Sequence, residues 1–185
     1  MAKLLYSLTE SLDGYIADEK GNFDWSEPDE VEHRFVNDLI RPVGTFLFGR
    51  RMYETMRFWE TALDDPSHPD YMRDFAEIYL AADKIVYSKS LTDVTTARTT
   101  LKSSLDLDEI RALKSSADRD IEIAGPTLAA RAIEAGLVDE YHFFIAPVIL
   151  GGGTKMLPDN VKLKLRLLDE KRFETGKLYL HYEPV

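Results

Sequence analysis

The sequence contains no cysteine. This absence excludes disulfide bonds, thiolate metal ligands and cysteine nucleophiles, and it fits a protein of the reducing cytoplasm. Basic residues are also scarce, because 23 lysines and arginines face 33 aspartates and glutamates, for a formal net charge of -10. Nucleic-acid binding needs a basic surface, so no nucleic-acid partner is expected. A small anion held by a few local cations remains compatible with this charge.

Long apolar runs are missing as well. No stretch approaches the roughly 18 apolar residues of a membrane-spanning helix, so no membrane association is expected. The first residues, MAKLLYSLTES, are too few and too polar for a signal peptide. The composition, 44% hydrophobic and 30% charged, is that of a soluble globular protein. We therefore expect one cytoplasmic domain spanning residues 1–185.

The sequence also lacks histidines at the spacing typical of a metal site. The four histidines lie far apart along the chain, at His33, His68, His142 and His181. No pair has the short spacing that is typical of a metal site. The sequence therefore predicts no metal, and we interpret all four as structural or surface residues.

Apolar periodicity predicts an alternation of short strands and helices. Strands are expected at 3–9, 45–48, 84–88, 121–123 and 141–150, and helices at about 31–40, 50–56, 70–82, 106–114 and 127–135. Ser26 and Thr127 are the expected N-caps of two helices, and Gly136 is expected to end the second in a left-handed conformation. After Pro158, the alternating residues 161–173 and 177–182 predict an antiparallel hairpin.

Three predicted strand ends carry residues suited to an anion. Gly49-Arg50-Arg51 follows one strand, Ser88-Lys89 follows another, and Gly125 leads from a third into a helix. Ligands collect outside the carboxyl ends of strands in open α/β sheets, and a helix N-terminus favours negative charge. Simpler interpretations stay open: the two arginines are solvated or paired with acids, and Gly125-Pro126 is an ordinary turn signal.

Several motifs in this order resemble the dihydrofolate reductase-like superfamily. They are Ser11 to Ala17 (SLDGYIA), Phe48 to Glu54 (FGRRMYE), Tyr87 to Leu91 (YSKSL), Ala124 to Leu128 (AGPTL), Val138 to His142 (VDEYH) and Pro147 to Gly153 (PVILGGG). More closely, the chain resembles the C-terminal reductase domain of the bifunctional riboflavin-biosynthesis deaminase-reductase and its stand-alone relatives. The resemblance implies an α/β, three-layer fold, with a mostly parallel central sheet and a C-terminal antiparallel hairpin.

The resemblance further implies an NADPH-dependent reductase that forms a homodimer. Gly49, Arg50 and Arg51 would hold cofactor phosphate. Ser88 and Lys89, with Arg51 and with help from Arg98, would select the 2′-phosphate. The pyrophosphate would lie along Gly125, Pro126, Thr127 and Leu128, and the glycine run around Gly152 would pass close to the nicotinamide. The riboflavin reductase typically reads Glu-Gly-Gly where this chain has Ala124-Gly125-Pro126, and Pro126 has no N–H to offer.

Hydride transfer also needs a proton donor, and two carboxylates are candidates. Asp13 is the one that the resemblance favours, and its alternative role is a turn-forming residue before Gly14. Glu30 is the second, because dihydrofolate reductases have a carboxylate early in the corresponding helix; alignment on Pro28 places Glu30 there, whereas alignment on Phe35 places Val31 there. The alternative role of Glu30 is a solvated acid in a first turn. Trp25 and Tyr53 are expected to wall the pocket of a planar heterocycle, although aromatics are more often core residues.

Together these features predict an NADPH-dependent reductase of a small heterocyclic substrate, resembling 5-amino-6-(5-phosphoribosylamino)uracil reductase. Two alternatives remain. One is a relative that reduces dihydrofolate or another C=N or C=O compound. The other is a non-catalytic domain that binds or senses NADPH.

Overall fold

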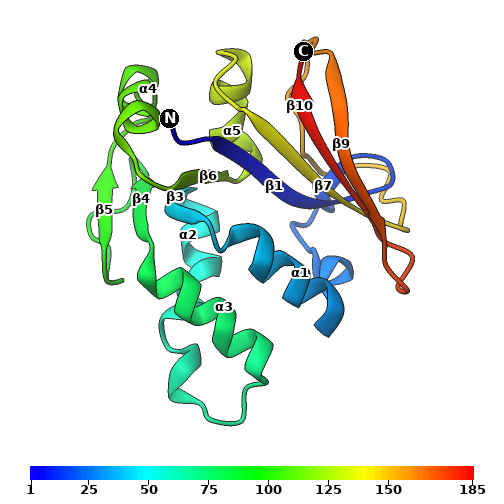
Figure 1. The fold of residues 1–185 in the computed structure, drawn as a ribbon, viewed down its shortest axis with the longest axis horizontal. Helices are drawn as coiled ribbons and strands as arrows, with labels where there is room; N and C mark the ends of the chain where they lie inside the picture. Colours follow the sequence, from blue (N-terminus) through cyan, green and yellow to red (C-terminus); the bar gives the residue numbers. More distant parts are fainter.

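An eight-stranded sheet runs through the middle of the protein in a computed structural model that describes all residues from 1 to 185 (Figure 1). The strand order is β5-β4-β3-β6-β1-β7-β10-β9. Strands β1, β3, β4, β5, β6 and β7 are parallel, while β10 and β9 are antiparallel to their neighbours. This confirms the predicted sheet. The strands are β1 (Leu4–Ser11), β3 (Val43–Gly49), β4 (Asp83–Tyr87), β5 (Thr99–Lys102), β6 (Asp120–Ala124), β7 (Glu140–Ala146), β9 (Leu165–Arg172) and β10 (Leu178–Pro184).

Helices cover both faces of the sheet and make three layers (Figure 1). The helices are α1 (Glu30–Ile40), α2 (Arg50–Met56), α3 (Asp70–Ala81), α4 (Leu107–Ser116) and α5 (Pro126–Glu134). Helices α1 and α3 lie on one face, and α4 and α5 lie on the other. Alternation along the strands separates two cores, since Leu4 and Tyr6 pack toward α4 and α5 whereas Leu5 packs with residues of α1 and α3.

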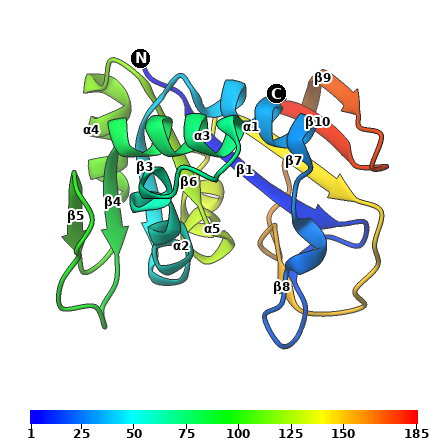
Figure 2. The ribbon, with the colours of Figure 1, turned by 90° about the horizontal axis from the view of Figure 1, so that it is seen from below.

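The parallel strands bring the carboxyl ends of β3, β4 and β6 to one edge of the sheet. Gly49 pairs with Tyr87, and Phe48 pairs with Ala124, so the three strands end side by side. Helices α2 and α5 begin at this edge (Figure 2). A small second sheet joins β2 (Tyr15–Ala17) to β8 (Thr154–Lys155), and thereby brings the loops after β1 and β7 together.

The C-terminal hairpin forms as predicted, with Gly176 in its turn at a φ of 90°. Two strands are shorter than expected. Strand β7 ends at Ala146 rather than Leu150, because Pro147 has no N–H for a sheet hydrogen bond. Strand β9 begins at Leu165 rather than at Val161.

Two predicted helix N-caps are wrong, and the predicted helix-ending glycine is confirmed. Asp29, not Ser26, caps α1, and its side chain accepts a hydrogen bond from the Glu32 N–H. Gly125 rather than Thr127 is the N-cap of α5, since Pro126 already occupies the first helical position. Gly136 has the predicted left-handed φ, at 64°, and Asp106 caps α4. No helix has the length and apolar character needed to cross a membrane.

Candidate active site at the sheet edge

Two unpaired cations stand at the ends of β3 and β4. Arg50 is already engaged, since its guanidinium donates to Glu54 at 2.7 Å and to the Ser90 hydroxyl at 3.0 Å. It therefore ties together the loops that follow the two strands. Arg51 and Lys89 are exposed, and their cationic groups form no hydrogen bond or ion pair within the protein. In a chain with ten more acids than bases, two unpaired cations at adjacent strand ends are suited to an external anion.

Ser88 shapes the turn that presents Lys89. Its hydroxyl oxygen accepts hydrogen bonds from the backbone N–H groups of Ser90, at 3.2 Å, and of Leu91, at 3.0 Å. A serine hydroxyl that folds back on its own turn fixes the loop conformation. The predicted phosphate residues Gly49, Arg50, Arg51, Ser88 and Lys89 thus share one edge.

The start of α5 adds open N–H groups to this edge. Gly125 has a φ of 98°, a conformation that a residue with a Cβ rarely adopts. The first N–H groups of a helix have no partner within it, and here Pro126 lacks one, which leaves those of Thr127 and Leu128. A hollow of about 220 Å³ lies beside this turn. Its lining residues are Pro126, Thr127, Ala130, Thr154, Lys155, Leu157, Pro158 and Asp159.

A larger hollow, of about 430 Å³, lies between the start of α4 and α5. Its two arginines are already occupied. Arg111 pairs with Asp108 at 2.7 Å, and Arg131 donates to the Leu105 carbonyl at 2.9 Å. Because these charges are compensated, this hollow is a weaker candidate for an anion than the edge near Arg51.

Asp13 holds the glycine loop after β7. Its carboxylate accepts hydrogen bonds from the Ser11 hydroxyl at 2.7 Å and from the N–H groups of Leu150, at 3.0 Å, and Gly151, at 2.7 Å. These donors, the Ser11 hydroxyl first, lower the pKa of Asp13 to about 2. A carboxyl group with this pKa is ionised at neutral pH, so the geometry favours a positioning task for Asp13 over proton donation.

The glycine run packs directly against β2. A Cβ on Gly153 would lie 2.0 Å from the Ala17 carbonyl oxygen, and one on Gly152 would lie 3.0 Å from the Glu19 carboxylate. Gly153 can therefore lie this close to β2 only without a side chain, whereas the flexible Glu19 side chain can move away from one at Gly152. Gly152, predicted to lie near the nicotinamide, is placed by its neighbour Gly153.

Glu10 is a partly buried carboxylate that is not among the candidates from the sequence. It lies near the end of β1, paired with Ile145 of β7, and its carboxylate is close to Gly14. Burial raises the pKa of Glu10 to about 7. Little in the sequence distinguishes Glu10, because a polar residue late in an alternating strand is commonplace.

The structure separates Glu30 from its neighbour Glu32. Glu30 is exposed on α1 and pairs with Arg34 at 2.9 Å. Glu32 is buried and pairs with Lys177 at 2.7 Å, and it also accepts a hydrogen bond from the Thr175 hydroxyl. The D-x-x-E pattern from Asp29 is a capping signature that could have drawn attention to Glu32.

The two predicted pocket aromatics differ. Tyr53 is a core residue, 3% exposed, and its hydroxyl accepts a hydrogen bond from the Thr95 N–H at 3.0 Å, so its part in a pocket wall stays a prediction. Trp25 is half-buried in the short 3₁₀ helix Asp24–Ser26, and its indole N–H is buried without a hydrogen-bond partner. Lys177 holds this segment by donating to the Ser26 and Glu27 carbonyls.

Arg98 does not belong to this edge. It pairs at 2.9 Å with Asp83, the first residue of β4. Ser88 lies at the opposite end of that strand, directly after its last residue. The expected help of Arg98 with a 2′-phosphate is therefore corrected, because a strand's length separates the two positions.

The sheet order, the C-terminal hairpin and the edge just described define an α/β protein with a dihydrofolate reductase-like fold. The chain belongs to the RibD C-terminal domain family, whose model matches residues 2–179. Among curated proteins, it is 25% identical to the uncharacterised protein YyaP of Bacillus subtilis (strain 168), over 97% of this chain and 94% of that protein.

Two solved structures show the same fold. One is a diaminohydroxyphosphoribosylaminopyrimidine deaminase/5-amino-6-(5-phosphoribosylamino)uracil reductase from Thermotoga maritima, with a TM-score of 0.69 and 17% identity. The match covers all of this chain and 57% of that longer one. The other is dihydrofolate reductase from Enterococcus faecalis complexed with NADP(H), with a TM-score of 0.63 and 15% identity, covering 98% and 96% of the two chains.

Proposed function

We propose that this protein is an NADPH-dependent reductase of a small heterocyclic compound. The observation that carries the proposal is the pair of unpaired cations, Arg51 and Lys89, at the edge where α5 begins. The dihydrofolate reductase of the same fold is complexed with NADP(H), and the Thermotoga relative is described as a reductase, which supports the cofactor and the reaction class.

The residues present suit the cofactor's phosphates. The open N–H groups of Thr127 and Leu128 would bind the pyrophosphate at the start of α5. Arg51 and Lys89 would bind the 2′-phosphate. The Ser88 turn and the hydrogen bond from Arg50 to Ser90 would hold their loops in place. The nicotinamide supplies the hydride when bound, and the protein's task is to place the acceptor atom beside it.

Glu10 is the proton donor in this proposal. Reduction of a C=N or C=O bond adds a hydride to carbon and a proton to nitrogen or oxygen. A carboxyl group whose pKa is about 7 still carries a proton near neutral pH, unlike that of Asp13. Glu10→Gln is expected to lower kcat about 10²–10⁴-fold and to abolish a fall in rate above pH 7. An unchanged pH profile in Glu10→Gln would remove Glu10 from this role.

The reductase activity is tested with purified protein, NADPH and a panel of pyrimidine, pteridine and carbonyl compounds, by following the absorbance of the reduced nicotinamide. Oxidation of NADPH with a pyrimidine or pteridine is the expected result, and turnover of dihydrofolate alone would select the folate alternative. Clear NADPH binding without turnover across the panel would favour a sensing role. Absence of any binding would overturn the proposal.

Arg51 gives a sharper test of cofactor choice. Loss of one guanidinium–phosphate contact is worth about 1.5–3 kcal/mol, which is roughly a 10–150-fold change in Kd. Arg51→Ala should weaken NADPH by that factor and leave NADH nearly unchanged. Arg57→Ala is the matched control, since Arg57 is another exposed arginine without a partner, located beyond the end of α2. Equal losses for both cofactors would remove Arg51 from the 2′-phosphate site.

We also propose that two copies of the chain associate through β9. This edge strand pairs only with β10, and its opposite edge is free. Leu167 and Leu168 are 45% and 42% exposed there. The first half of this free edge, Leu165 to Leu168, carries three leucines, and a free edge strand favours pairing with another strand. Light scattering should give the mass of a dimer, and Leu167→Asp should give a monomer; a monomeric wild-type protein would refute this assembly.

A further inference from the structure

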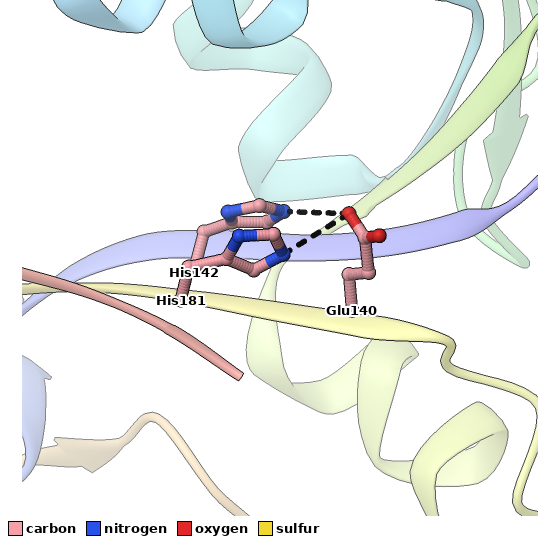
Figure 3. Close-up of side chains that lie close together, drawn as sticks. All are labelled: Glu140, His142 and His181. Atoms are coloured by element: carbon pink, nitrogen blue, oxygen red, sulfur yellow. Dashed lines mark ion pairs between the residues drawn. The ribbon is translucent and has the colours of Figure 1, made fainter. Parts of the chain in front are cut away.

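Three potential metal ligands converge on one face of the sheet, away from the edge described above (Figure 3). Glu140 and His142 are two residues apart on β7, and His181 lies directly opposite His142 on β10. Their ring nitrogens and carboxylate oxygen all lie within 4.8 Å of one another. In the other direction along the sheet, His142 pairs with Ser7 in the middle of β1, whereas the candidate active site lies beyond the strand ends.

Two of the three ligand-atom separations match those around a small metal ion. Glu140 Oε2 is 3.5 Å from His142 Nε2 and 3.2 Å from His181 Nε2. A tetrahedral ion with bonds of about 2.0–2.1 Å places its ligands roughly 3.3 Å apart. Figure 3 shows both rings directing these nitrogens toward the same carboxylate oxygen. Both distances are close to the separation expected between two ligands of one ion.

The Nε2 nitrogens of His142 and His181 are buried and lack a hydrogen-bond partner. His142 is 1% exposed, and the Nε2 atoms of His142 and His181 make no hydrogen bond. A buried polar atom without a partner costs free energy, so such atoms are rare in folded proteins. A bound cation would satisfy both nitrogens at once.

The surroundings of His142 suit a ligand nitrogen. Its Nδ1 is 2.8 Å from the Tyr179 hydroxyl. With the proton on Nδ1 donated to that hydroxyl, the lone pair on Nε2 is free for a metal, as in most metal-bound histidines.

Lys3 is the one cation at the cluster, and it contacts the other carboxylate oxygen. Its ammonium group pairs with Glu140 Oε1, so Oε2 remains available. The Lys3 side chain is 56% exposed and can turn into solvent. On the far side of the hairpin, β9 places Asp169 opposite His181, which adds negative charge to the same region.

We propose that Glu140, His142 and His181 form a binding site for one zinc-class divalent ion, with Glu140 Oε2 and the two Nε2 atoms as ligands. Histidine and carboxylate together favour zinc among the common cations, and three protein ligands leave a fourth position for water. The ion joins β10 to β7 and so fastens the C-terminal hairpin to the parallel sheet. Its role is structural, since both histidines lie inside their strands and all three ligands lie away from the carboxyl ends where the candidate active site is.

The test uses the full-length protein after removal of metal with a chelator. Zn²⁺ is titrated in competition with a chromophoric chelator, and Co²⁺ is added separately to read its visible absorption. One equivalent of Zn²⁺, a rise in Tm and a tetrahedral Co²⁺ spectrum are expected. Less than about 0.2 equivalents, or no Co²⁺ band, would overturn the site.

Two variants locate the ion. His181→Gln is chosen because His181 is the more exposed histidine, at 18%, and its replacement is the less damaging to folding. It should weaken Zn²⁺ at least 10-fold and abolish the Tm rise. His68→Gln is the control, since His68 lies outside the metal cluster, in the loop before α3, where it contacts the Ala62 carbonyl. Equal affinity in wild type and His181→Gln, or equal losses in both variants, would refute the assignment.

Discussion

Replacing Lys177 tests how the Trp25 segment is held beside the sheet edge. The Lys177 ammonium is 2.7 Å from Glu32 Oε2, and the two side chains are 6% and 2% exposed. It also donates to the carbonyls of Ser26 and Glu27, both at 3.0 Å. Lys177→Met therefore leaves a buried carboxylate and two backbone acceptors without their donor. Breaking a buried ion pair from one side costs about 3–5 kcal/mol.

The expected thermal effect follows from the size of the protein. For a chain of this length, 1 kcal/mol shifts Tm by roughly 2–4 °C, so Lys177→Met should melt about 6–20 °C lower. Scanning calorimetry and urea titration measure both quantities. The double variant Glu32→Leu/Lys177→Met should recover most of the loss, because no buried charge remains. Lys155→Met is the control, since it breaks the exposed Lys155–Asp159 pair and should cost less than about 1 kcal/mol.

Two results would refute this reasoning about Lys177. A loss no larger than that of Lys155→Met would mean that the buried pair is not stabilising. A double variant whose loss equals the sum of the single losses would mean that Glu32 and Lys177 act independently.

Three further predictions concern other parts of the chain. Burial raises the pKa of Glu122 to about 8 from 4.5, so the folded state holds a proton that the unfolded chain releases. Stability should fall as pH rises from about 4.5 to 8, and Glu122→Gln should flatten that fall in urea titrations; an unchanged slope would contradict it. Asp13→Ala should speed hydrogen exchange at the Gly151 N–H, and unchanged protection would deny Asp13 its positioning role. Gly153→Ala should cost more than about 3 kcal/mol, because its Cβ would meet the Ala17 carbonyl; a urea midpoint like that of wild type would refute the close contact.

The sequence predicts the strands and helices well where apolar periodicity is strong. Helix α3 was expected at 70–82 and runs from Asp70 to Ala81, because one apolar face repeats at helical spacing. Boundaries set by a single residue are harder. Ser26 and Thr127 both look like caps, but Asp29 and Gly125 take those positions once Pro28 and Pro126 constrain the backbone.

The candidate edge was predictable because its signals are local. Gly49-Arg50-Arg51, Ser88-Lys89 and Gly125 each follow a strand directly, and parallel strands place such ends together. Which cation is free could not be predicted, since Arg50 finds Ser90 only in the folded chain.

Buried polar pairs between distant segments could not be inferred. Glu32 meets Lys177 across 145 residues, and nothing local distinguishes it from the exposed Glu30. His142 and His181 meet only because β10 pairs with β7 in one register. A shift by one residue would point His181 to the opposite face, so their proximity depends on tertiary structure.

The central claim is that the edge beside Arg51 and Gly125 binds a dinucleotide carrying a 2′-phosphate. Isothermal titration of the purified protein with NADPH and with NADH, in the same buffer, tests it most directly. We predict one site per chain and an affinity for NADPH at least 10-fold higher than for NADH. Equal affinities, or no heat with either cofactor at millimolar concentration, would contradict the account.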